Sequence, residues 1–184
     1  EDIHWSMGGM TTPTQRPLIP LKLSDKVKVE FLPPEQTLEG MLESGELDAL
    51  LAIFIPSIFE KGSPRIGRLF PNYYEVEQDY YRRTKIFPIM HTVVLRGDVY
   101  REHPWAARSI YRAFCEARDL AVEGLYDTDA LRLSLPWLIH HIEETWLVMG
   151  KDFWAYGLKP NQPTLKAIGE YVYEQGLSPR IVSP

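Results

Sequence analysis

Cysteine is almost absent from this sequence, because Cys115 is the only one among 184 residues. A single thiol excludes an internal disulfide, which fits the reducing cytoplasm. Cys115 lies in a helical pattern, where a small buried thiol is more common than a nucleophile. Also missing are a Cys-x-x-Cys pair, a phosphate-binding glycine loop and a nucleophile elbow. The cluster His140–Glu144 lacks two histidines four positions apart, so we expect no metal site there.

Long apolar runs and an excess of positive charge are missing too. The longest apolar run, Ala49 to Pro56, is far shorter than the roughly 20 residues that cross a bilayer, so we expect no membrane partner. The 20 basic and 25 acidic residues give a formal net charge of -5, which excludes a general attraction to nucleic acid. We expect a cytoplasmic protein. Because the first residue is Glu1, a signal upstream of it would make the location periplasmic instead.

The first half of the chain has an α/β pattern. Ile3–Met7 and the alternating Val27–Leu32 predict strands. Thr37 is the expected N-cap of a helix that ends at Gly45. The nearly continuous apolar segment Leu47–Ile53 predicts a strand buried on both faces of a mostly parallel sheet. Crossover connections between such strands are typical of βαβ units.

The second half is predicted to be helical. Phe87–Leu95 is expected to be a strand that joins the two halves. Amphipathic spacing predicts a long helix over 104–117, with a proline in its first turn. Further helices are expected over 74–83, 135–149 and 163–175. The stretch 11–20, which holds three prolines, is expected to be a loop.

Four polar side chains are candidates for ligand contacts. Ser57 follows a predicted strand, and ligands of open α/β sheets lie at the carboxyl ends of strands; it is equally a turn residue. Arg68 has the planar donor group that binds a carboxylate, although a lone arginine usually faces solvent. Arg82 is likewise either a contact for a carboxylate or a side chain that faces solvent. His91 interrupts an apolar strand, either as a structural residue or as a proton carrier near neutral pH.

Taken in order, several phrases resemble the 4,5-dihydroxyphthalate decarboxylase family over essentially the whole chain. They are Trp5-x-x-Gly8-Gly9, Thr37-Leu38, Gly45-Glu46-Leu47-Asp48-Ala49-Leu50, Pro56-Ser57, Gly67-Arg68-Leu69-Phe70-Pro71, Tyr80-Tyr81-Arg82-Arg83-Thr84, Ile86-Phe87-Pro88-Ile89-Met90-His91, His103-Pro104-Trp105, Ser134-Leu135-Pro136-Trp137, Asp152-Phe153-Trp154-x-Tyr156-Gly157 and Glu174-Gln175-Gly176-Leu177-Ser178. The resemblance implies the two-lobed fold of type II periplasmic binding proteins. Residues 1–90 would form the α/β second lobe, and residues 91–184 the crossover strand and helices that pack on the first lobe. Most of that first lobe would precede Glu1.

The resemblance also implies an activity, the non-oxidative release of carbon dioxide from 4,5-dihydroxyphthalate or a similar aromatic carboxylate. Such a reaction needs no cofactor in principle. His91 would donate the proton, Arg68 and Arg82 would bind the substrate, and Ser57 would orient it. The alternative is a non-catalytic binding protein, such as a transport receptor, for a small aromatic or carboxylate ligand. The sequence is also compatible with a homo-oligomer.

Overall fold

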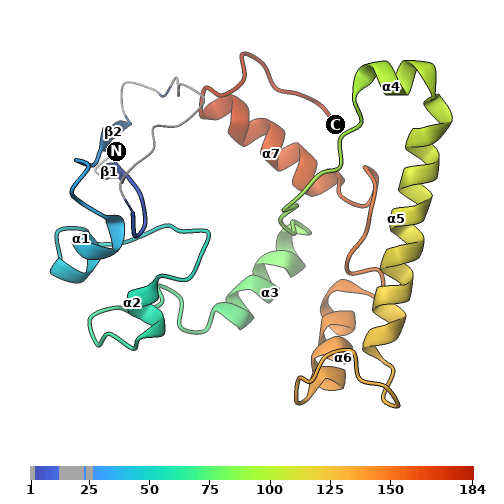
Figure 1. The fold of residues 1–184 in the computed structure, drawn as a ribbon, viewed down its shortest axis with the longest axis horizontal. Helices are drawn as coiled ribbons and strands as arrows, with labels where there is room; N and C mark the ends of the chain where they lie inside the picture. Colours follow the sequence, from blue (N-terminus) through green and yellow to red (C-terminus); the bar gives the residue numbers. More distant parts are fainter. Residues whose placement is uncertain (1–2, 13–22, 24–26) are drawn as a thin grey trace. The chain divides into compact units, whose positions relative to one another are not determined.

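The computed structural model describes residues 3–12, 23 and 27–184 (Figure 1). The chain divides into two units, Glu1–Tyr73 with Ile168–Val182, and Tyr74–Ala167 with Ser183–Pro184. Most of the loop predicted over 11–20 lies outside the described residues. The predicted lobes, residues 1–90 and 91–184, refer to a complete two-lobed protein and stay a prediction.

A short parallel sheet lies at the start of the first unit. Strands β1 (His4–Met7) and β2 (Lys28–Phe31) pair in parallel, with His4 opposite Lys28 and Met7 opposite Phe31. The Leu32 N–H donates to the Met7 carbonyl at 3.0 Å, which extends the contact. Both predicted strands are confirmed. The parallel pairing agrees with the α/β character expected for this part of the chain.

The first helix begins and ends where the sequence predicts. In α1 (Leu38–Ser44), the Thr37 hydroxyl accepts a hydrogen bond from the Gly40 N–H at 3.2 Å. Gly45 ends the helix in the left-handed conformation, with φ of 85°. The Leu38 N–H donates to the Gly9 carbonyl at 3.0 Å, so the start of α1 lies against the chain that leaves β1. A short helix, α2 (Ser57–Glu60), follows in the same unit.

Two of the predicted strands are wrong. Leu47–Ile53 and Phe87–Leu95 form no strand. Both segments are apolar, but a strand also needs a neighbour to pair with, and the described residues supply none. The side chains of Leu51, Ile53 and Val94 are therefore 89%, 94% and 86% exposed. Instead of the expected sheet, the described chain has one parallel pair of strands and is mostly helical.

Five further helices follow in the described chain, separated by loops. They are α3 (Tyr73–Thr84), α4 (Gly97–Glu102), α5 (Pro104–Leu125), α6 (Leu138–Met149) and α7 (Gln162–Glu174). The four helices predicted in this region, α3, α5, α6 and α7, are confirmed, and the long one extends eight residues beyond the predicted end. No helix in the described ranges is both long enough and apolar enough to cross a membrane.

In the second unit α5 contacts α6, and the two helices lie side by side in Figure 1. The ring of Tyr126 stacks on that of Trp146 with centroids 5.3 Å apart. The Tyr126 hydroxyl donates to Glu143 at 2.7 Å. Ile142, only 6% exposed, lies in the same helix α6. Stacking of this kind contributes about 0.5–1.5 kcal/mol beyond the burial of apolar area.

Candidate functional site

Ser57 is bound to a buried carboxylate. Its backbone N–H donates to Oε1 of Glu39 at 2.7 Å, and its hydroxyl donates to Oε2 of the same side chain at 2.7 Å. Glu39 is only 6% exposed and lies in the first turn of α1. These two bonds fix the first residue of α2 against α1. This pair could not be predicted from a local pattern, because 18 positions separate the two residues.

Arg68 lies between two aromatic rings in the same unit. Its guanidinium is 5.1 Å from the centroid of the Phe59 ring and 4.7 Å from that of Tyr73. Each such contact contributes about 0.5–1 kcal/mol at an exposed site. The side chain is exposed, and the rings restrict its orientation without using its hydrogen-bond donors. This arrangement can present a planar fork of N–H groups to a carboxylate.

Arg82 belongs to a polar network between α3 and α6. Its Nη2 donates to the Gln78 side-chain carbonyl at 2.8 Å, and the Gln78 amide lies 3.5 Å from Oε1 of Glu144. The Tyr74 hydroxyl donates to the other oxygen of Glu144 at 2.5 Å. This hydrogen bond lowers the pKa of Glu144 and raises the pKa of Tyr74. Arg82 is thus bonded along its own helix while its side chain stays exposed.

His91 lies in the extended segment between α3 and α4, and its side chain is exposed. The start of this segment is fixed at Phe87. The Thr164 hydroxyl donates to the Phe87 carbonyl at 3.0 Å and accepts from the Phe87 N–H at 3.2 Å. The Phe87 ring also meets Trp154 edge-on, with centroids 5.7 Å apart. These contacts of Phe87 therefore fix the start of the segment that leads to His91.

The four predicted residues are divided between the two units. Ser57 and Arg68 lie in the first, and Arg82 and His91 in the second. Within the first unit, α2 connects two of them, because it begins at Ser57 and carries Phe59, on which Arg68 stacks. The roles assigned to all four stay predictions. Glu39 and the two rings around Arg68 are the members that the sequence analysis missed.

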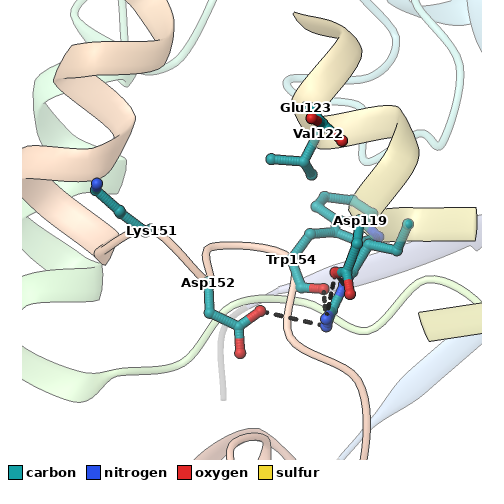
Figure 2. Close-up of a pocket in the computed structure, with 7 residues that line it drawn as sticks. Asp119, Val122, Glu123, Lys151, Asp152 and Trp154 are labelled. Carbon is teal, nitrogen blue, oxygen red and sulfur yellow. Dashed lines mark hydrogen bonds and ion pairs between the residues drawn. The ribbon is translucent and has the colours of Figure 1, made fainter. Parts of the chain in front are cut away.

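A pocket in the second unit lies between α5 and the turn after α6 (Figure 2). Its volume is about 290 Å³, and its lining comprises Arg118, Asp119, Val122, Glu123, Lys151, Asp152 and Trp154. Arg118 is already paired with Asp119 at 2.7 Å and with Asp152 at 3.2 Å. With three carboxylates against two cations, this lining does not suit an anionic ligand. Within the described ranges, no three His, Cys, Asp or Glu side chains are grouped to hold a metal ion.

Comparison with known proteins gives two relatives and no matching family model. The chain is 33% identical over 183 residues to the 4,5-dihydroxyphthalate decarboxylase of Comamonas testosteroni, across 100% of this chain and 56% of that protein. It is 40% identical over 81 residues to the 4,5-dihydroxyphthalate decarboxylase of Pseudomonas putida, across 44% of this chain and 31% of that protein. The chain thus spans about half the length of the Comamonas relative. The resemblance drawn from the motifs is confirmed.

Proposed function

Since this chain is homologous along its whole length to a 4,5-dihydroxyphthalate decarboxylase, we propose that the complete protein is a non-oxidative aromatic-acid decarboxylase. Its proposed substrate is 4,5-dihydroxyphthalate or a similar aromatic carboxylate. The observation that carries the proposal is the match itself, 33% identity over 183 residues. Fold alone would not support an activity.

The reaction follows from the chemistry of the substrate. A ring hydroxyl para to the leaving carboxylate donates electrons into the ring, and the carbon that bears this carboxylate takes up a proton. The bond to the carboxylate then breaks, carbon dioxide leaves, and the ring regains its aromaticity. The site needs an acid near the ring carbon and an anchor for the carboxylate that remains.

Arg68 suits the anchor because two rings hold its guanidinium through their faces, a contact that leaves its N–H donors free to meet a carboxylate. His91 is the proposed acid, since histidine is the side chain most often used for general acid–base catalysis. Its exposed side chain allows access to a bound ring. Arg82, exposed on α3, is a second proposed contact for the substrate, and Ser57 a third.

The proposed fold is the two-lobed arrangement of type II periplasmic binding proteins. The parallel β1–β2 pair supports it. So do the largely apolar segments over 50–55 and 89–95, which form neither helix nor strand and hold exposed side chains such as Ile53 and Val94. Exposed apolar segments of this kind are typical of strands that lack a neighbour. The part of the Comamonas relative outside the match, nearly half its length, is the proposed source of that neighbour.

The test uses the complete protein with 4,5-dihydroxyphthalate, following carbon dioxide and 3,4-dihydroxybenzoate. Replacing His91 by Ala should lower kcat by about 10²–10⁴-fold, the usual contribution of a positioned acid. His141→Ala is the matched control, because His141 is also an exposed histidine of the second unit, and it should retain activity. Full activity of the His91 variant would remove His91 from the mechanism. Ligand-dependent thermal stabilisation without carbon dioxide release would show a binding protein instead.

Arg68→Lys tests the anchor separately. Lysine keeps the charge but loses the planar fork and the stacking on two rings. We expect KM to rise about tenfold or more, with a smaller change in kcat. Arg83→Lys is the control, because Arg83 is exposed and pairs with Asp79 on its own helix. Equal KM values for the two variants would contradict the anchor role.

A further inference from the structure

Both hydrogen-bond donors of Ser57 are already in use. The N–H donates to Oε1 of Glu39 and the hydroxyl donates to Oε2, each at 2.7 Å. In both bonds Ser57 is the donor and a carboxylate oxygen of Glu39 is the acceptor. The Ser57 carbonyl in turn accepts the Lys61 N–H at 3.0 Å inside α2. The two lone pairs of the Ser57 Oγ are the hydrogen-bonding groups that a ligand can still use.

Ser57 can therefore only accept a hydrogen bond from a ligand. A substrate carboxylate has no proton to offer at neutral pH, so Ser57 cannot bind that group directly. A ring hydroxyl does have a proton to donate. The hydrogen-bonding capacity of Ser57 thus distinguishes the two kinds of polar group on a dihydroxyphthalate.

We infer that Ser57 forms a hydrogen-bond acceptor site for a ring hydroxyl of the substrate, and that Glu39 is the positioning residue that sets its polarity. This inference rests on the proposed function. Glu39 suits the role because it is only 6% exposed and holds Ser57 through two short bonds. Ser57 is half-buried, and Glu39 holds its Oγ from one side.

Arg68 and Ser57 suit different polar groups of the substrate. Arg68 stacks on Phe59, which is two positions after Ser57 in α2. Arg68 offers only donors and suits a carboxylate, whereas Ser57 offers only an acceptor and suits a hydroxyl. The helix α2 would thus orient the ring through Ser57 and through Phe59, which holds Arg68. Arg68 would donate hydrogen bonds to a carboxylate, and Ser57 would accept one from a hydroxyl. A site of this kind rejects the analogue that lacks the hydroxyl.

The test compares the Kd values of the complete protein for 4,5-dihydroxyphthalate and for phthalate, which lacks both hydroxyls, by titration calorimetry. The ratio of the two Kd values measures the preference for the hydroxylated ring. We expect Ser57→Ala to reduce this ratio about tenfold, the effect of one hydrogen bond. Ser57→Thr keeps a hydroxyl and should restore the ratio.

Glu39→Gln tests the positioning residue. A glutamine amide that faces Oγ would donate to it, so the Ser57 hydroxyl would turn its proton outward and the ratio should fall as well. Glu43→Gln is the matched control, because Glu43 is an exposed glutamate of the same helix, and it should leave the ratio unchanged. A purely structural role of Glu39 would weaken both ligands equally and preserve the ratio.

The outcomes separate the two proposals. If the wild-type protein binds neither compound, the proposed function fails and this inference with it. If the wild type prefers the hydroxylated ring and the Ser57→Ala variant keeps that preference, only the inference is wrong. A reduced ratio in Ser57→Ala and Glu39→Gln, with recovery in Ser57→Thr, supports it. Should Glu39→Gln fail to fold, the alanine and threonine variants of Ser57 still decide the matter.

Discussion

Replacing Gly45 by alanine should destabilise the protein through the backbone alone. Gly45 has φ of 85° at the end of α1, and a Cβ added there would meet no atom within 4 Å. Its N–H is shared between the carbonyls of Met41 and Leu42, at 3.1 and 3.3 Å, and the Glu46 N–H reaches Met41 at 2.9 Å. An L-residue in the left-handed region costs about 1–2 kcal/mol. No steric clash adds to this cost.

The assay is urea unfolding of the wild type and the variant, with Cm and m fitted together. We expect Cm to fall with m unchanged, and Tm to fall by about 2–8 °C for a chain of this size. Gly67→Ala is the matched control. Gly67 also has open space around its Cβ, but its φ is not in the left-handed region.

The control should behave in the opposite sense. Alanine at a compatible backbone position lowers the entropy of the unfolded chain and stabilises by about 0.4–1 kcal/mol. The two variants therefore differ in the sign of their effect, although each adds one methyl group to an open surface. Equal effects at Gly45 and Gly67 would refute the explanation, because the left-handed conformation would then have no cost of its own.

Three further predictions concern the second unit. The pKa of Glu144 is lowered, chiefly by the hydrogen bond from Tyr74, so the stability that it contributes is present above the unfolded pKa of about 4.3 and is lost as the pH falls through the folded pKa. Tyr74→Phe should weaken this acid-side loss in urea titrations at several pH values; an unchanged pH profile would contradict it. Thr164→Val removes the hydroxyl that pairs with both backbone groups of Phe87, and amide hydrogen exchange at Phe87 should become faster; equal exchange would show that the contact is not formed in solution. Lys85, with φ of 58° after α3, should tolerate glycine with a gain of up to about 1 kcal/mol in thermal unfolding, and a loss would indicate that its side chain matters more than its backbone.

The sequence predicted best what neighbouring residues determine. The helix start at Thr37 and the helix end at Gly45 depend on side chains within a few positions, and both are confirmed. The same holds for the proline in the first turn of α5. Such features are set by local hydrogen bonds and dihedral preferences, which the order of residues carries directly.

Features that depend on distant residues were predicted poorly. The apolar runs Leu47–Ile53 and Phe87–Leu95 have the composition of strands, but composition does not supply the neighbour that a strand pairs with. The candidates Ser57 and Arg68 came from their residue types and positions. Their partners, Glu39 at 18 positions' distance and the ring of Phe59, depend on how the chain folds back, which no short pattern encodes.

The anchoring of Phe87 by Thr164 sets a limit on the reach of His91. His91 is four positions after Phe87, and an extended chain covers at most about 3.6 Å per residue, so the Cα of His91 lies within about 14 Å of the Cα of Phe87. The contact between Thr164 and Phe87 therefore fixes one end of the short segment whose other end is the proposed acid. Through its contact with Phe87, Thr164 thus limits the volume in which the proposed acid can lie.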